Sequence, residues 1–146
     1  MTYEETLHYL YTSIPVFQHS GASAYKPGLG TSIALDDYLG NPHKAYKTIH
    51  VAGTNGKGSV SHLLAAILRQ SGFKVGLYTS PHLVDFRERI RVNGKKISQD
   101  YVVDFVERHR SFFEPLHPSF FELTSSMAFE YFRDQQVDYA VIEVGL

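Results

Sequence analysis

The stretch Thr48-Ile-His-Val-Ala-Gly-Thr-Asn-Gly-Lys-Gly-Ser59, which continues into residues 60–72, decides the fold. It predicts a short buried strand, then a glycine-rich turn with one lysine, then an amphipathic helix. Apolar residues recur along the helix with the spacing i, i+3, i+4, i+7, i+8, at Val60, Leu63, Leu64, Ile67 and Leu68. Gly72 stands where a left-handed residue is expected to end the helix.

The glycine-rich turn predicts a phosphate-binding site. A turn that opens a helix presents backbone N–H groups and the positive end of the helix dipole, and Lys57 adds a mobile positive charge. The turn departs from the usual G-x-x-x-x-G-K-[ST] loop, because Val51 replaces its first glycine and Gly58 replaces its Ser or Thr. The dinucleotide-binding fingerprint fits less well, since the glycines are spaced G-x-x-G-x-G. The alternative is a plain tight turn with a solvated lysine.

The composition is that of one soluble domain. The chain has 146 residues, a formal net charge of −1, 43% hydrophobic residues and no cysteine. The near-neutral charge gives no reason to expect nucleic acid or an anionic membrane as a partner, and the lack of cysteine excludes disulfides and thiolate chemistry. No apolar run approaches the ~20 residues of a membrane span, and residues 1–5 are acidic and lack the core of a signal peptide. We therefore expect a cytoplasmic protein.

Helix and strand signals alternate along the rest of the chain. Helices are expected at 3–14, 31–40, 99–113 and 120–135, strands at 73–78 and 138–144, and a hairpin at 89–97. The hairpin is expected because Asn93-Gly94 suits a tight type I′ turn. The alternation predicts an α/β fold with a mostly parallel sheet, flanking helices and a small β-hairpin. In such sheets ligands bind at the carboxyl ends of the strands, where the segments 53–59, 79–82 and 143–146 would meet.

Two side chains at these strand ends suggest a metal site. Glu143 lies in an otherwise apolar strand, where an unpaired carboxylate is costly to bury and Mg²⁺ would compensate its charge. The alternatives are an edge position in solvent or a partner arginine. Ser80 follows the strand at 73–78, and its hydroxyl is a suitable ligand for a hard metal, although Thr-Ser-Pro is also a routine turn.

Other polar residues have structural explanations of equal weight. Ser119-Phe-Phe-Glu122 predicts either a capping box that opens a helix or a segment that lines a substrate pocket. His50 and His62 are interpreted as packing or surface residues, since the histidine spacing makes no metal set. The charged run at 87–91 is expected to form a solvated, partly paired face of the hairpin.

Several motifs taken together resemble one enzyme family. They are Gly53-Thr-Asn-Gly-Lys-Gly-Ser59, Thr79-Ser-Pro-His-Leu83, Glu88-Arg-Ile-Arg-Val-Asn-Gly94, Phe120-Phe-Glu-Leu-Thr124 and Glu143-Val-Gly-Leu146. In this order they resemble the motifs of folylpolyglutamate synthase and dihydrofolate synthase, members of the Mur ligase superfamily. The resemblance covers about residues 25–146, and it implies the phosphate-loop NTPase-like fold of the Mur ligase central domain.

The resemblance also implies a reaction and a set of site residues. Such enzymes use MgATP to phosphorylate a carboxylate of a folate or dihydropteroate, and the amine of L-glutamate then attacks the acyl phosphate. The ATP loop would be Thr54, Asn55, Gly56, Lys57, Gly58 and Ser59, with Lys57 and Glu143 as catalytic residues and Ser80 and Glu143 as Mg²⁺ ligands. The substrate-binding residues would be Lys26, Pro27, Gly28, Leu29, Ser119, Phe120, Phe121 and Glu122.

Members of this family are longer than this sequence. We therefore expect residues 1–146 to be the N-terminal part of the ATP-binding domain, without the C-terminal glutamate-ligase domain, and to be inactive alone. The full-length protein is expected to be a monomer and the fragment to self-associate, because an unfinished sheet exposes an edge. Two alternatives stay open: another phosphate-loop nucleotide-binding domain of kinase or GTPase type, and a non-catalytic fragment.

Overall fold

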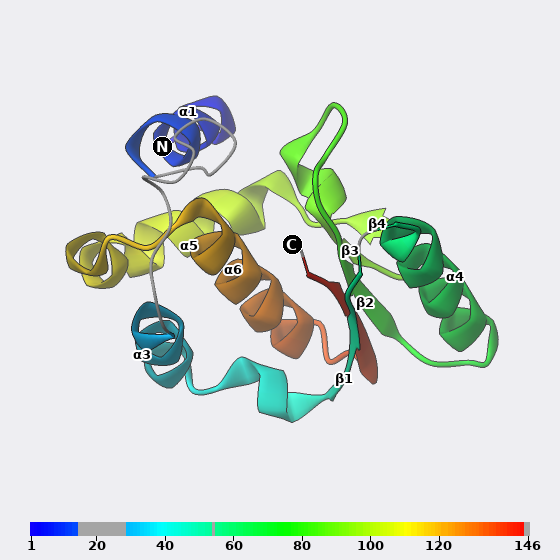
Figure 1. The fold of residues 1–146 in the computed structure, drawn as a ribbon. Coiled ribbons are helices and arrows are strands. Elements are labelled where there is room, and N and C mark those ends of the chain that lie inside the picture. Colours follow the sequence, from blue (N-terminus) through cyan, green and yellow to red (C-terminus); the bar gives the residue numbers. More distant parts are fainter. Residues whose placement is uncertain (15–28, 54, 145–146) are drawn as a thin grey trace. The chain divides into compact units, whose positions relative to one another are not determined.

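The computed structural model describes residues 1–14, 29–53 and 55–144. The chain forms two compact units (Figure 1). The helical unit consists of Met1–Asn41 and Gln99–Met127, and the sheet unit of Pro42–Ser98 and Ala128–Leu146.

The sheet unit contains a five-stranded mixed sheet with the strand order β1-β5-β2-β3-β4. The strands are β1 (Lys47–Val51), β2 (Val75–Tyr78), β3 (Ile90–Val92), β4 (Lys95–Lys96) and β5 (Tyr139–Glu143). β5 pairs in parallel with β1 and β2, whereas β3 pairs antiparallel with β2 and β4. The α/β class is thus confirmed, but the sheet is mixed rather than mostly parallel.

The hairpin makes the sheet mixed because it joins the main sheet directly. The N–H of Asn93 donates to the carbonyl of Val75 at 2.9 Å, and the N–H of Val75 donates to Oδ1 of Asn93 at 2.9 Å. Asn93 and Gly94 both have positive φ, 48° and 80°, as the predicted type I′ turn requires. The turn therefore anchors β3 against the start of β2.

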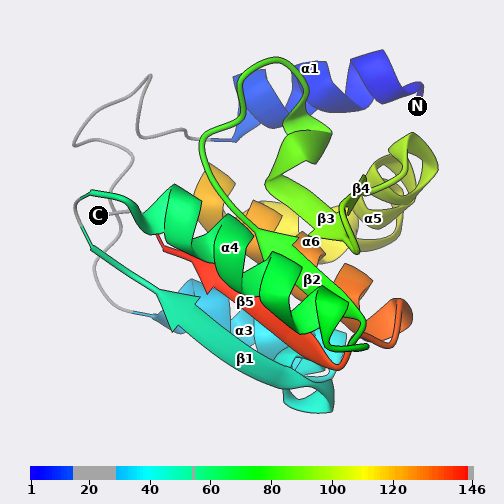
Figure 2. The same cartoon turned by 90° about the vertical axis from the view of Figure 1, so that its right-hand side faces the viewer.

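Helices cover both faces of this sheet (Figure 1, Figure 2). On one face lies α4 (Lys57–Gln70), whose Leu64, Ala65 and Leu68 pack against the sheet residues Val51, Val75, Leu77 and Val141. On the other lies the second half of α6 (Phe120–Asp134), where Phe132 is fully buried against Gly76 of β2. Two 3₁₀ helices, η2 (Pro42–Ala45) and η3 (Phe86–Arg89), connect these elements.

One expectation for the central stretch is wrong in detail. β1 was expected to be buried, but only Val51 is, because β1 is an edge strand whose one strand partner among the described residues is β5. The apolar stripe of α4 faces the sheet only in part: Val60, Leu63 and Ile67 are 48%, 62% and 53% exposed. The expected helix stop is confirmed, since Gly72 has φ 95°.

The helical unit contains α1 (Tyr3–Ser13), α3 (Gly30–Leu39), α5 (Gln99–Phe113), the 3₁₀ helix η4 (Glu114–Leu116) and the start of α6. The expected helices are confirmed to within one residue at each end. Along α5 the predicted apolar stripe is buried, from Val102 through Val106 and His109 to Phe113. Tyr38 of α3 stacks on Phe112 of α5, with ring centroids 3.9 Å apart. In the described residues, every helix is too short or too polar to cross a membrane.

Candidate functional site

The candidate site begins at the turn between β1 and α4. Gly56 is the N-cap residue of α4 and has the left-handed φ of 75°, a conformation that glycine adopts without steric cost. No side chain of the described residues caps this helix, and the first backbone bond of the turn runs from Val60 N–H to Gly56 C=O at 3.0 Å. The N–H groups of Lys57, Gly58 and Ser59 therefore have no partner within the helix, as an anion site requires.

Glu143 ends β5 directly beside this turn. It lies opposite Val51 in the parallel register, and its side chain is 3% exposed. A Cβ atom placed on Gly58 would lie 3.8 Å from Oε2 of Glu143, so the carboxylate faces the first turn of α4. The structure thus brings Lys57, Gly58 and Glu143 together. The alternative of a solvent-exposed edge position for Glu143 is excluded, since β5 lies between β1 and β2.

The described residues compensate the charge of Glu143 poorly. Burial raises the pKa of its carboxyl above the ordinary value, and the nearby charges of Lys57 and His62 lower this pKa in part. Among the described residues, no side chain or backbone group donates a hydrogen bond to this carboxylate. A buried carboxylate with these neighbours is suited to hold a divalent cation.

Ser80 lies at the same edge of the sheet. β2 runs beside β5, with Tyr78 opposite Ile142, and Ser80 follows two residues after Tyr78. The backbone at this point is held by the N–H of Thr79, which donates to the carbonyl of Arg89 at 3.0 Å. Ser80 is half-buried. The carboxyl ends of β1, β2 and β5 thus converge as the sequence predicted.

The segment that follows Ser80 is more ordered than the sequence suggested. Arg89 was expected to be solvated but is 7% exposed, and its Nε donates to Nδ1 of His82 at 2.7 Å. Burial and the charge of Arg89 lower the pKa of His82. Glu88 accepts the backbone N–H groups of residues 83–85, which lower its pKa. The spacing of Asp85 and Glu88 is a capping-box signal in the sequence, whereas the contact between Arg89 and His82 has no such signal.

Comparisons with known proteins agree with the motifs. No family model matches the chain. A probable bifunctional folylpolyglutamate synthase/dihydropteroate synthase of Haloferax volcanii is 40% identical over 100% of this chain and 17% of its own length. The dihydrofolate synthase/folylpolyglutamate synthase of Bacillus subtilis is 40% identical over 83% of this chain and 30% of its own length. The chain belongs to the folylpolyglutamate synthase/dihydrofolate synthase family. It spans about a third or less of the length of these relatives.

Solved structures of the family match the fold. The crystal structure of folylpolyglutamate synthase from Thermotoga maritima superposes with a TM-score of 0.86 and 47% identity, covering 99% of this chain and 33% of that one. An FPGS–AMPPCP–folate complex matches with a TM-score of 0.84 and 36% identity, covering 100% and 36%. The Mycobacterium tuberculosis enzyme complexed with ADP matches with a TM-score of 0.85 and 35% identity, covering 99% and 32%. Members of this family thus bind adenine nucleotides.

The remaining site residues of the family resemblance lie elsewhere. Thr54, Lys26, Pro27 and Gly28 fall outside the described residues, and Leu29 is 69% exposed at the start of α3. Residues 119–122 form the predicted capping box: Ser119 N–H donates to Glu122 Oε1 at 2.8 Å, and Glu122 N–H donates to Ser119 Oγ at 3.1 Å. Phe120 is buried and Phe121 is 44% exposed. These residues belong to the helical unit, and their predicted role in substrate binding stays a prediction.

One neighbour of the site was not predicted. His62 is exposed, which agrees with one of the two interpretations left open by the sequence, and it lies close enough to Glu143 to lower the pKa of that carboxyl. No signal in the sequence indicated this proximity. His62 and Glu143 are 81 residues apart, and they come together only because β5 passes beside α4 in the folded sheet.

Proposed function

We propose that this chain forms the N-terminal part of the ATP-binding domain of an ATP-dependent amide ligase. The reaction is the addition of L-glutamate to a carboxylate of a folate or dihydropteroate, by way of an acyl phosphate. The observation that carries the proposal is the uncapped N-terminus of α4 with the buried carboxylate of Glu143 beside Gly58. This arrangement joins an anion site to a cation ligand in one place, as a metal–nucleotide complex requires.

The phosphate loop supplies the nucleotide contacts. Backbone N–H groups of residues 55–59 would hold the phosphate oxygens, and the Lys57 ammonium would offset the charge on the outermost phosphate. Gly58 replaces the usual Ser or Thr of such loops, so the metal-binding hydroxyl must come from another residue. Ser80 is suited to that part, because it lies at the same sheet edge as Glu143.

The donor set fits Mg²⁺, which prefers carboxylate and hydroxyl oxygens and retains several waters. Glu143 and Ser80 would hold it, and a bound Mg²⁺ would neutralise charge on the transferred phosphoryl group. The chain's own contribution is to hold Lys57 and Glu143 beside the N-terminus of α4 and to keep Glu143 away from bulk water.

The proposed reaction also follows from carboxylate chemistry. A carboxylate is a poor electrophile, and its phosphorylation provides a good leaving group for attack by the glutamate amine. The folate complex of a family member supports the substrate class. We further propose that residues 26–29 and 119–122 contact the folate, with Phe121 as the exposed aromatic surface of the second segment.

Nucleotide titration of the chain tests the proposal. Isothermal titration with AMPPCP, with and without Mg²⁺, should show binding that Lys57→Ala weakens about tenfold or more, because a charged hydrogen bond is lost. Lys44→Ala is the matched control, since Lys44 is an exposed lysine of the same unit in η2. Equal affinity of the Lys57→Ala and Lys44→Ala variants would refute the phosphate-loop assignment.

The metal assignment has a separate test. Gly58→Ala adds a Cβ atom at ordinary contact distance from Glu143, so the fold tolerates it while the space in front of the carboxylate narrows. Both this variant and Glu143→Gln should lose the gain in affinity that Mg²⁺ gives to the parent chain, while metal-free nucleotide binding persists. An undiminished Mg²⁺ effect in Glu143→Gln contradicts the role of Glu143. Glutamate-dependent ADP release by the 146-residue chain would contradict the expectation that it is inactive alone.

A further inference from the structure

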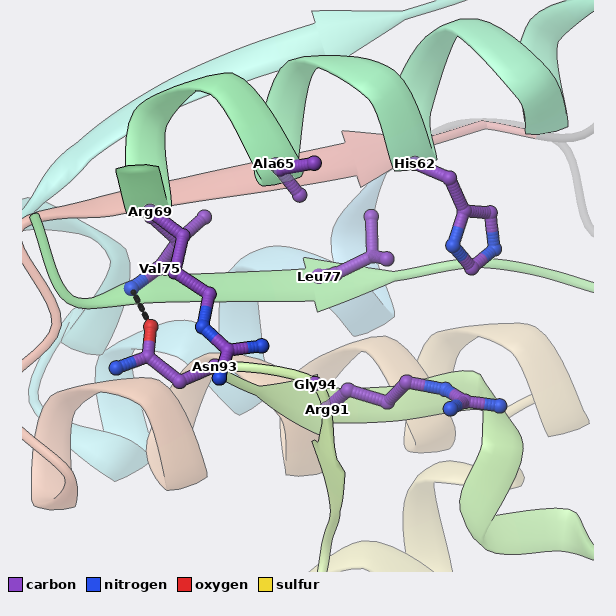
Figure 3. Close-up of a pocket in the computed structure, with 9 residues that line it drawn as sticks. His62, Ala65, Arg69, Val75, Leu77, Arg91, Asn93 and Gly94 are labelled. Atoms are coloured by element: carbon purple, nitrogen blue, oxygen red, sulfur yellow. Dashed lines mark hydrogen bonds between the residues drawn. The ribbon is translucent and has the colours of Figure 1, made fainter. Parts of the chain in front are cut away.

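A hollow on the sheet unit lies outside the phosphate-loop site. It has a volume of about 190 Å³ and lies between the C-terminal half of α4 and the strands β2 and β3. Val75 and Leu77 form its floor, and Arg69, Arg91 and His62 border it (Figure 3). Its volume is below the ~300 Å³ at which pockets for drug-sized ligands begin, so it suits a small ligand.

The charged side chains that line this hollow have one sign. Its lining contains two arginines and a histidine but no aspartate or glutamate. Within the described part of the chain, neither Arg69 nor Arg91 lies within ion-pair distance of a carboxylate. Neither arginine thus has an ion-pair partner among the described residues, although the charge of Arg91 is close enough to Glu88 to lower the pKa of that carboxyl.

Each of the two arginines lies close to backbone at the edge of the hollow. Nη1 of Arg69 lies 2.8 Å from the point where a Cβ atom on Gly94 would stand, so its guanidinium rests against the hairpin turn. Nε of Arg91 donates to the carbonyl of Glu88 at 3.3 Å, which leaves its terminal nitrogens available. The turn beneath Arg69 is itself fixed by the two hydrogen bonds between Asn93 and Val75. The turn that borders the hollow is therefore preorganised.

The cations stand at separate positions around an apolar floor. In Figure 3, Arg69 reaches down at the end of α4 near Asn93, whereas Arg91 runs along β3 towards the side on which His62 lies. The two guanidinium groups therefore point to different parts of the hollow. A ligand with two anionic ends and an aliphatic middle can place one end on each arginine and its middle against the apolar lining, which includes Ala65 and Ala66 besides Val75 and Leu77.

We propose that this hollow binds a small aliphatic dicarboxylate, with one carboxylate on Arg69 and the other on Arg91. Guanidinium groups bind carboxylates through paired N–H donors, and the apolar floor favours a chain of methylene groups between them. The site is distinct from the phosphate loop and does not depend on the proposed ligase function.

Nuclear magnetic resonance titration of the labelled 16.5 kDa chain tests this proposal. Glutarate should shift the amide signals of Asn93 and Gly94 with saturation, and its affinity should fall as ionic strength rises. Butyrate, with one carboxylate, and inorganic phosphate, a compact anion, should each bind about tenfold or more weakly. Arg69→Ala and Arg91→Ala should each weaken glutarate binding about tenfold or more, while Lys44→Ala leaves it unchanged.

Each result of this titration either supports or refutes the dicarboxylate site. Both arginines are at the surface, so the variants are expected to keep the parent spectrum away from the hollow, which verifies their fold. If phosphate or butyrate binds as well as glutarate, the dicarboxylate assignment is wrong. If Lys44→Ala weakens glutarate binding as much as Arg69→Ala does, the binding is general surface electrostatics and the site is refuted.

Discussion

Gly76→Ala is the substitution that tests most directly how the sheet unit is packed. Gly76 lies in β2 between β3 and β5, and Phe132 of α6 packs against it from one face of the sheet. A Cβ atom on Gly76 would lie 2.6, 2.7 and 2.8 Å from Cδ1, Cε1 and Cγ of the Phe132 ring. Carbon atoms attract at about 3.5–4.0 Å, so the ring would have to move by about 0.8 Å.

The ring has little room for such a movement. Phe132 is fully buried, and Tyr46 packs edge-on against it with ring centroids 6.1 Å apart. The hydroxyl of Tyr46 donates to the carbonyl of Phe129 at 3.1 Å, which holds Tyr46 in place. Overpacking of this kind costs about 1–3 kcal/mol, against a gain of about 0.5–1 kcal/mol from removing a glycine from a strand. We expect Gly76→Ala to lower the free energy of unfolding by about 1–2 kcal/mol.

Urea unfolding followed by circular dichroism measures this change. Gly30→Ala is the matched control, because no atom lies within 4 Å of the added Cβ, and its stability should equal or exceed that of the parent. The companion variant Phe132→Leu removes the ring atoms that clash, so Gly76→Ala should cost at least about 1 kcal/mol less in that background. A Gly76→Ala protein as stable as the parent, or a cost unchanged by Phe132→Leu, would refute this account of the packing.

Three further predictions concern charge, backbone and surface. Burial raises the pKa of Glu143, so ionisation of this carboxyl lowers the stability of the folded chain as the pH rises through the raised pKa. Glu143→Gln should therefore increase the metal-free unfolding free energy, measured in urea, by about 1–2 kcal/mol at pH 8 and by little at pH 4. Gly94→Ala should lower that free energy by about 1 kcal/mol, since φ is 80° there, and a normal urea midpoint would contradict this. Leu63→Lys and Ile67→Lys should leave stability within about 0.5 kcal/mol of the parent but reduce self-association in sedimentation experiments; unchanged association means that the exposed flank of α4 is not the contact.

Local signals in the sequence were enough to place the elements. The capping box at 119–122, the Asn93-Gly94 turn and the Gly72 stop all act through neighbouring backbone atoms, and all three are confirmed. What failed were statements about partners distant in sequence. The burial of β1 depends on which strands flank it, and the pairing of β3 with β2 makes the sheet mixed; neither is encoded within a short window.

The same distinction explains the candidate site. Lys57 and Gly58 could be identified because a phosphate loop is a continuous segment, and Glu143 because a carboxylate in an apolar strand is unusual. The proximity of the loop to Glu143 could be predicted because the carboxyl ends of parallel strands lie at the same edge of a sheet. The position of His62 beside Glu143 and the burial of Arg89 against His82 could not be predicted, since each depends on side-chain directions set by the folded sheet.

The apolar stripe of α4 divides between two surfaces of the helix. Successive helical residues are rotated by about 100°, which places Val60, Leu63 and Ile67 on a different flank from Leu64 and Leu68. The flank that carries His62 and Arg69 borders the hollow beside β3. The apolar flank therefore faces the other side, towards β1, whose outer edge carries no strand within the described residues. An edge strand and an adjacent apolar helix flank together expose unpaired backbone groups and apolar side chains to solvent. We therefore expect the chain to self-associate through this side of the sheet.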